Sequence, residues 1–304
     1  MNNFKKLGLT ALAGSLVAST AFAGSMDVSG SAKVSYASKD GQGVSGAPMS
    51  NSKAITFSGS GDLDNGMTVS TSYTMDNVTF STSQVVLDMG DSGTLSFMNG
   101  TSLAGLNKYQ DVMPTAGEQV WDDIGDDEDY GVVGTGNLNS LGYEVSFNNL
   151  TASASLTKAA TGTESSLVLI ANDLIDGVQL GYGIGKDAST VLVEDDHSTM
   201  WAKYTIGGVT LGVQDSSIDK STNDIDRTAA AISFAVNESI SVSYGISDVE
   251  FENASLVDEE SSGISASYTA GGMTIGAVMN KTDNVGGSTG VEGTFTEVSV
   301  AFAF

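Results

Sequence analysis

The sequence of 304 residues contains no cysteine, two prolines and one histidine. The absence of cysteine excludes disulfides and thiolate metal sites. The scarcity of proline fits a chain made mostly of paired strands, because each strand needs its backbone N–H groups for pairing. No apolar run of 18 residues follows the first 23 positions, which excludes a membrane protein built from helices.

Basic residues are also scarce, with 12 lysines and arginines against 37 acidic residues and a formal net charge of −25. A chain without basic clusters has no surface for phosphate contacts, so we expect no nucleic-acid partner. The excess of acid should attract cations. Strong acidity can indicate disorder, but apolar residues make up 40% of this chain and follow a regular pattern. We therefore expect most of the chain to fold.

The first residues, MNNFKKLGLTALAGSLVASTAFAG, have the three parts of a secretory signal. Lys5 and Lys6 precede an apolar run, and Ala21-Phe22-Ala23 is a small-residue cleavage site. We predict a signal peptide at 1–23 and a mature chain at 24–304, outside the cytoplasm. Loss of the two lysines would change the net charge from −25 to −27. An anchor helix is the alternative, and the run is too short and too rich in small residues to favour it.

The rest of the chain alternates with a period of two, which is typical of β-strands with two unlike faces. At the carboxy terminus, GTFTEVSVAFAF places Val298, Val300, Phe302 and Phe304 on one face. We predict sixteen such strands, from 26–38 to 293–304, among them 177–187 and 196–206. One face carries large apolar residues and the other mostly serine, threonine and glycine.

Long and short connections alternate along the chain. Tight turns such as NN, GG and NE join every second pair of strands, whereas most of the other connections are longer. An up-and-down sheet sorts its loops to two rims in this way, and a Greek-key sandwich does not. Sixteen antiparallel strands closed into a barrel leave an interior too wide for side chains to fill. The pattern therefore favours an all-β, closed, antiparallel transmembrane barrel with a hydroxyl-lined, water-filled lumen and an apolar outer face.

Aromatic residues support this orientation. Five of the eight descending strands finish near the short-turn rim with an aromatic residue on the apolar face. Aromatic rings favour the headgroup level of a membrane, so we interpret these residues as an interfacial girdle. The predicted girdle consists of Phe147, Tyr204, Phe234, Tyr268, Phe302 and Phe304.

The longest connection, at about 99–138, follows the fifth strand and is the third loop of the long rim. Eight acidic residues against Lys108 alone give it a net charge of −7. It also contains apolar residues, including Leu106, Met113, Val120 and Trp121, which favour a loop that packs against a wall. Its acids are Asp111, Glu118, Asp122, Asp123, Asp126, Asp127, Glu128 and Asp129.

With its signal peptide, sixteen hairpin-joined strands, long acidic third loop and terminal phenylalanine, the chain resembles the general diffusion porins of Gram-negative outer membranes. The nearest type is the alphaproteobacterial one, which the stretch ITFSGSGDLDNGMTVSTSY resembles. The resemblance implies a homotrimer in outer-membrane lipid that passes ions and small hydrophilic solutes without a cofactor. It also implies a third loop that bends inward to form a constriction, whose acids face a basic cluster on the opposite wall.

The basic cluster is where this sequence departs from the family pattern. Only three basic residues occupy the alternating strand positions that face the lumen, and they are the candidates for a basic wall: Lys33, Lys203 and Arg227. Lys53 falls on the other face. With few cations to oppose the acids, the constriction should have a negative potential and concentrate cations. We therefore expect a preference for cations and small neutral solutes that weakens as salt rises.

Three further functions were considered. The acidic run WDDIGDDEDYG could bind calcium, although it lacks the ligand spacing of an EF-hand, and a solvated acidic loop competes with this interpretation. His197 is expected to be a solvated residue at a loop edge, and no catalytic motif accompanies it or any serine, so we expect no enzyme. A soluble β-rich adhesin or layer protein is the main alternative, which the terminal phenylalanine and the sorted loops disfavour.

Overall fold

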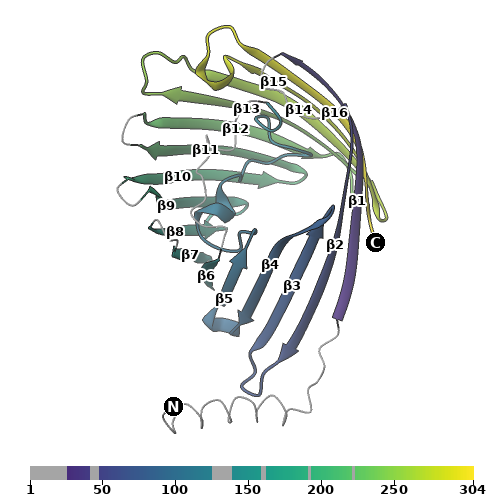
Figure 1. Cartoon of the computed structure of the whole chain (residues 1–304), viewed down its shortest axis with the longest axis vertical. Helices are drawn as coiled ribbons and strands as arrows, with labels where there is room; N and C mark the ends of the chain where they lie inside the picture. The colour runs from purple at the N-terminus through teal and green to yellow at the C-terminus, as the bar shows by residue number, and fades with distance from the viewer. Residues whose placement is uncertain (1–25, 42–47, 125–138, 159–161, 191–192, 221–222) are drawn as a thin grey trace.

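A computed structural model describes residues 26–41, 48–124, 139–158, 162–190, 193–220 and 223–304. These residues form one closed ring of sixteen strands around a loop that lies inside it (Figure 1). The strands are β1 (Met26–Gly41), β2 (Met49–Asp62), β3 (Thr68–Asp76), β4 (Thr79–Asp88), β5 (Thr94–Asn99), β6 (Ser140–Phe147), β7 (Leu150–Lys158), β8 (Thr163–Asn172), β9 (Val178–Thr190), β10 (Val193–Ile206), β11 (Val209–Asp219), β12 (Ile225–Ala235), β13 (Ile240–Phe251), β14 (Glu259–Ala270), β15 (Met273–Asp283) and β16 (Glu292–Ala303). Within the described ranges, three short 3-10 turns accompany the strands, η1 (Gly90–Ser92), η2 (Leu106–Tyr109) and η4 (Val285–Gly287).

Every strand pairs antiparallel with its neighbours in sequence, and β1 pairs with β16 to close the ring. The last residue takes part in this closure. The N–H of Gly30 donates to the carbonyl oxygen of Phe304 at 2.7 Å, and the N–H of Phe304 donates back at 2.9 Å. The predicted sixteen-stranded antiparallel barrel is confirmed, and its closure leaves no sheet edge unpaired.

Tight turns at one rim depend on residues that tolerate positive φ. Asn148 between β6 and β7 has φ 53°, and the glycines Gly207 and Gly271 have φ 58° and 59°. Asparagine and glycine adopt this left-handed conformation at little cost, which allows hairpins of minimal length. The short-turn rim predicted from the sequence is therefore built by local turn chemistry.

The two faces of the sheet differ as the alternation predicts. On β13 the outward side chains Val242, Tyr244 and Ile246 are 39%, 49% and 47% exposed, whereas Gly245 and Ser247 between and beside them are buried. The same inversion holds around the ring, with large apolar side chains exposed outside and mostly small or hydroxyl-bearing ones inside. The large apolar residues of the inner face lie where the loop packs on the wall, as Val168, Trp201 and Phe295 do. A soluble protein would bury the face that carries the large apolar side chains. This barrel exposes that face on its outer surface and keeps the polar face inside.

Two details differ from the sequence prediction. The expected loop at 188–195 is wrong, because β9 continues to Thr190 and β10 begins at Val193, with a register shift between Val193 and Asp195. Threonine and valine favour extended backbone, so the pairing persists past the expected ends. His197 is consequently not a loop residue: it lies in β10, faces the interior and is 4% exposed.

No helix in the described part of the chain is long and apolar enough to cross a membrane. The predicted signal peptide at 1–23 lies outside the described residues.

Candidate functional site

The third long-rim loop enters the barrel after β5 and is attached first to the wall formed by β7 and β8. The N–H of Gly105 donates to Ser153 Oγ at 3.0 Å, and the N–H of Leu106 donates to Ser166 Oγ at 2.9 Å. Leu106 is fully buried among Val168, Ile170 and Trp201. Burial of such a side chain stabilises the attachment by about 2 kcal/mol.

The loop then follows the inner wall across β12 to β15. Met113, Val120 and Trp121 pack with Ala229 of β12 in a second apolar cluster. Farther along, the N–H of Ala116 donates to Ser243 Oγ at 2.9 Å.

Two more contacts carry the loop to the seam of the barrel. Asn280 Nδ2 on β15 donates to the carbonyl oxygen of Gln119 at 2.9 Å. Ile124 packs with Ala37 of β1 and Phe295 of β16 in a third cluster. The inward-folded third loop predicted from the sequence is confirmed, and its apolar residues are those that hold it to the wall.

Three ionic contacts accompany this path. The ammonium of Lys108 lies 2.7 Å from Glu144 Oε2 on β6, and the hydroxyl of Tyr109 donates to the same oxygen at 2.9 Å. The guanidinium of Arg227 on β12 is 2% exposed and lies 4.2 Å from the ring centre of Trp121. Its Nη2 lies 4.0 Å from Asp111 Oδ1, so the chain's single arginine is held beneath the loop.

The third ionic contact is at the seam. Lys33 Nζ on β1 lies 3.2 Å from Glu118 Oε1 of the loop and 2.7 Å from Glu297 Oε1 of β16. Lys33, Lys203 and Arg227 all face the lumen, as the sequence parity places them. The expected basic wall opposite the loop is not formed, because Lys33 and Arg227 bind the loop itself and Lys203 lies beneath it.

The wall that the loop leaves uncovered has no basic residue on its lumen face. Within the described residues, loop positions 101–123 make no hydrogen bond or ion pair with β2, β3 or β4. The lumen faces of these strands carry mostly hydroxyl and amide side chains, with Thr56 and Thr74 joined at 2.9 Å, and three aspartates near the strand ends, Asp62, Asp76 and Asp88. Lys53 is their only basic residue, and it lies exposed on the outer face. The opening is therefore bordered by the loop on one side and by hydroxyl groups on the other.

The loop acids differ in how their ionisation is controlled. Burial inside the barrel, together with repulsion from three neighbouring carboxylates, raises the pKa of Asp122 to about 6, although a hydrogen bond from the N–H of Gln119 lowers it. The three neighbours are Asp111, Glu118 and Asp123. Burial also raises the pKa of Asp111, which Arg227 opposes. Burial likewise raises the pKa of Glu118, which Lys33 opposes.

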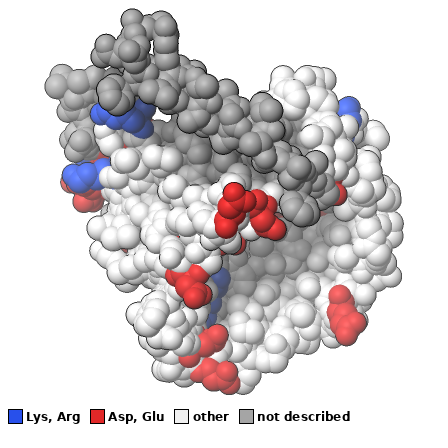
Figure 2. Space-filling view, turned by 90° about the horizontal axis from the view of Figure 1, so that it is seen from below, with Lys and Arg blue, Asp and Glu red and all other residues white. Residues whose placement is uncertain are grey.

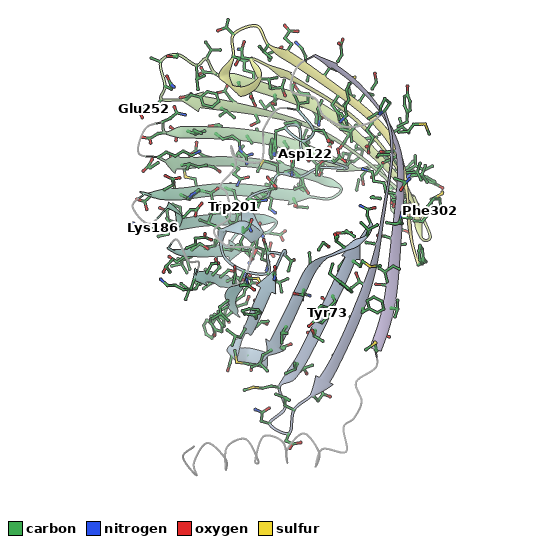
Figure 3. All side chains as sticks on the ribbon, viewed as in Figure 1. Tyr73, Asp122, Lys186, Trp201, Glu252 and Phe302 are labelled. Carbon is green, nitrogen blue, oxygen red and sulfur yellow. The ribbon has the colours of Figure 1, made fainter. Side chains whose placement is uncertain are left out.

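Asp122 lies inside the ring of strands in Figure 3, as does Trp201, whereas Phe302 lies on the outside. The other four predicted loop acids, Asp126, Asp127, Glu128 and Asp129, lie outside the described residues. No group of three or more His, Cys, Asp or Glu among the described residues could hold a metal ion.

The six aromatic residues of the predicted girdle all lie on the outer surface. Their exposed fractions range from 39% for Tyr204 to 79% for Phe304. Each lies within two residues of the end of an even-numbered strand, on the rim of short turns. This placement is that of a ring at one edge of the apolar band: Phe147, Tyr204, Phe234, Tyr268, Phe302 and Phe304.

Comparison with known proteins gives the family. A family model described as Gram-negative porin matches residues 8–304. The chain belongs to the Gram-negative porin family. No curated protein sequence matches this porin. Its apolar outer face contacts the lipid of the outer membrane, in which the barrel is an integral protein, and its lumen contains water.

Solved structures agree with the fold. A mutant of the Rh. blastica porin is 15% identical, with 92% of this chain and 100% of that chain covered and a TM-score of 0.68. The anion-selective porin from Comamonas acidovorans is 14% identical, with coverage of 92% and 99% and a TM-score of 0.66. OmpT of Vibrio cholerae, in a loop L8 deletion mutant, is 12% identical, with coverage of 93% and 100% and a TM-score of 0.69. The general porin fold expected from the sequence is confirmed, and the soluble adhesin is excluded by the membrane location.

Sequence reasoning missed two acids of the site. Glu144 on the lumen face of β6 binds Lys108 of the loop, and Glu297 on the lumen face of β16 binds Lys33 of the neighbouring strand β1. Alternation along the strands could have placed both acids in the lumen, since each lies one residue from an outward apolar side chain. The partner of Glu144 could not be found in this way, because it depends on the path of the loop.

Proposed function

We propose that this outer-membrane porin is a passive diffusion channel for ions and small hydrophilic solutes, and that the acidic loop makes it prefer cations. The observation that carries the proposal is the pairing of an acidic loop with a wall across the opening that has no basic residue on its lumen face. The described charged groups of the loop and its contacts comprise six acids and four bases, a net charge of −2: Asp111, Glu118, Asp122, Asp123, Glu144 and Glu297 against Lys33, Lys108, Lys203 and Arg227. Acidic patches also outnumber basic ones on the hollowed face in Figure 2.

The placement of the charges favours cations more than the count suggests. Lys33, Lys108 and Arg227 each lie within 4.0 Å of a carboxylate oxygen, so their fields are largely cancelled. Asp123 is exposed and forms no ion pair with a described basic residue. A charge in a narrow channel with low-dielectric walls has a focused field, which raises the local concentration of cations.

The test is the zero-current potential across a planar bilayer with a KCl gradient. The wild-type channel is expected to pass K⁺ more readily than Cl⁻, and Asp122→Asn with Asp123→Asn to reduce this preference. The control is Asp226→Asn with Glu250→Gln, because it removes the same two charges from the outer faces of β12 and β13, away from the lumen. Equal selectivity in the loop variant and the wild type would contradict the role of the loop.

We also propose that the porin assembles as a homotrimer. The proposal is supported by the family and by one similar structure, which is titled as the trimer form of OmpT of Vibrio cholerae. Migration of the unboiled protein at three times the mass of the boiled chain would support it. A monomer in mild detergent, measured by light scattering, would contradict it.

Two expectations about processing and ligands belong to the same proposal. Residues 1–23 are removed on export, which the mass of the protein purified from outer membranes tests. Calcium binding by the acidic run that begins at Trp121 stays a prediction, because most of its acids lie outside the described residues.

A further inference from the structure

A cavity of ≈ 660 Å³ lies beneath the constriction loop, on the side of the short-turn rim. Its roof is the loop segment that includes Tyr109 and Asp111, and its floor is the lumen face of β8 to β11 near their lower ends. In this family the short turns face the periplasm. A solute that has passed the loop therefore meets this cavity before it leaves the channel.

Lys203 on β10 is the basic group of the cavity floor. Its side chain is half-buried, and no described carboxylate lies within ion-pair distance of its ammonium. It differs in this from Lys33, Lys108 and Arg227, each of which binds an acid. A partly buried ammonium without a counter-charge favours an anionic ligand, because the ligand restores the charge pairing that burial removes from water.

The neighbours of Lys203 are hydrogen-bonding groups suited to a carboxylate. Gln179 is its direct cross-strand partner on β9 and donates from Nε2 to Asn172 Oδ1 at 2.8 Å. Thr205 and Thr210 lie on the same floor, with their hydroxyl oxygens 3.1 Å apart. These groups have fixed positions on paired strands, so the floor is already ordered before a ligand arrives.

The roof carries the opposite charge. Asp111 lines the same cavity, its side chain is 40% exposed, and its nearest cation, Arg227, lies at 4.0 Å. Lys108, which is paired with Glu144, and the exposed Asp173 of the turn after β8 also line this cavity. The cavity thus has an ammonium without an ion pair on its floor and a partly compensated carboxylate on its roof. A simple anion is repelled by the loop acids that it must pass, and a simple cation gains nothing from Lys203.

We propose that this cavity binds small zwitterionic solutes of the amino-acid class, with the carboxylate on Lys203 and the ammonium toward Asp111. The inference rests on the proposed diffusion function, in which such solutes enter through the loop. A site of this kind retains zwitterions in the channel over neutral solutes of equal size.

Tryptophan fluorescence provides a direct test at equilibrium. The indole N–H of Trp201 donates a hydrogen bond to Gln179 Oε1 at 3.3 Å. A ligand that binds beside Gln179 therefore changes the surroundings of the indole. The probes are alanine, a zwitterion, and lactamide, a neutral molecule of nearly the same size, titrated against the full protein in detergent. Alanine is expected to bind about tenfold more tightly, the difference typical of one charge-assisted hydrogen bond.

Variants assign the effect to the ammonium of Lys203. Lys203→Gln is expected to reduce alanine affinity about tenfold and Lys203→Arg to retain most of it. Lys53→Gln is the control, because it removes the same charge from the outer face of β2. Equal binding of alanine and lactamide, or an equal loss in Lys203→Gln and Lys53→Gln, would overturn the inference.

The outcome is separable from that of the diffusion proposal. Fluorescence reports binding whether or not ions flow, and bilayer conductance of the same preparations reports the channel. A conducting channel without alanine binding contradicts only the site, whereas alanine binding without conductance contradicts only the channel. Heat-modifiable migration of each variant on gels shows that the barrel is folded.

Discussion

Lys33 on β1 lies 3.2 Å from Glu118 of the constriction loop, and this contact ties the far part of the loop to the seam where the barrel closes. The same ammonium also binds Glu297 on β16 at 2.7 Å. One lysine therefore holds two carboxylates that would otherwise repel each other inside the barrel. The contact sets both the position of the loop and the charge of the opening.

Lys33→Met is expected to loosen the loop and strengthen cation preference. The substitution leaves Glu118 and Glu297 without their shared partner, and repulsion between them favours movement of the loop from the wall. Single-channel recordings should show more current noise and a larger ratio of K⁺ to Cl⁻ permeability. Lys53→Met, on the outer face of β2, should leave both unchanged. A quiet channel with wild-type selectivity in Lys33→Met would contradict this role.

Arg227→Lys is expected to destabilise the loop although it keeps the charge. A planar guanidinium stacks on Trp121 at 4.2 Å, which a compact ammonium does less well. Because Arg227 is almost fully buried, the loss should be about 2 kcal/mol in the free energy of unfolding. Thermal unfolding followed by circular dichroism measures it. Trp121→Leu should lower the temperature of thermal unfolding to a similar degree. The variant with both substitutions should be little less stable than either single variant.

Gly105→Ala is expected to detach the first part of the loop. Gly105 has φ 73°, and an added Cβ would collide with Oγ of Ser155 and of Ser166 on the wall. Gly207→Ala is the control, because Gly207 has φ 58° but faces open space, so it measures backbone strain alone. Single-channel conductance should rise in Gly105→Ala and stay at the wild-type value in Gly207→Ala. Equal conductance in the two variants would contradict the attachment.

Cation preference is expected to depend on pH through Asp122. Burial raises the pKa of this carboxyl to about 6, so it loses its charge as the pH falls from 7 to 5. The K⁺ preference should fall over that window, and Asp122→Asn should remove this step. Stability should change in the opposite sense: the folded state binds the proton more tightly than the unfolded state, so stability contributed by Asp122 increases as the pH falls through 6 toward 4. A step that persists in Asp122→Asn would assign the titration to another group.

A pair of like charges on the outer surface predicts a salt-dependent stability. Asp248 and Glu260 are direct cross-strand partners on β13 and β14, whereas Asp283, the partner of Glu260 on β15, binds Lys281 at 2.8 Å. Opposed like charges destabilise a sheet, so Asp248→Asn should stabilise the barrel by about 0.5 kcal/mol at low salt and by less at high salt. Asp64→Asn, in the exposed turn after β2, should have no such effect. Thermal unfolding at two salt concentrations checks the difference.

The number of strands, the face on which each side chain lies and the entry of the third loop into the barrel could be predicted from the sequence, because they depend on local pattern. The period of two placed Tyr244 outside and Ser247 inside, and the tight turns ordered the strands. The contacts of the loop could not be predicted in this way. Arg227 and Trp121 are far apart in sequence, and only the folded path of the loop brings them together.

The errors have the same origin. Tertiary pairing extended β9 and β10 beyond their local turn signals, which moved His197 from a loop edge to the interior. The expected basic wall failed because residue parity shows which side chains face the lumen but not which of them the loop covers. Lys33 and Arg227 were placed on the correct face, and their contacts were found only in the structure.

The most direct test of the central claim, an acidic loop facing a wall without basic residues, is the ratio of K⁺ to Cl⁻ permeability measured at rising ionic strength. The screening length is about 10 Å at 0.1 M salt and about 3 Å at 1 M, so fixed acids lose influence over this range. We predict a ratio above one that falls toward one as KCl increases. A ratio below one at low salt would contradict the claim.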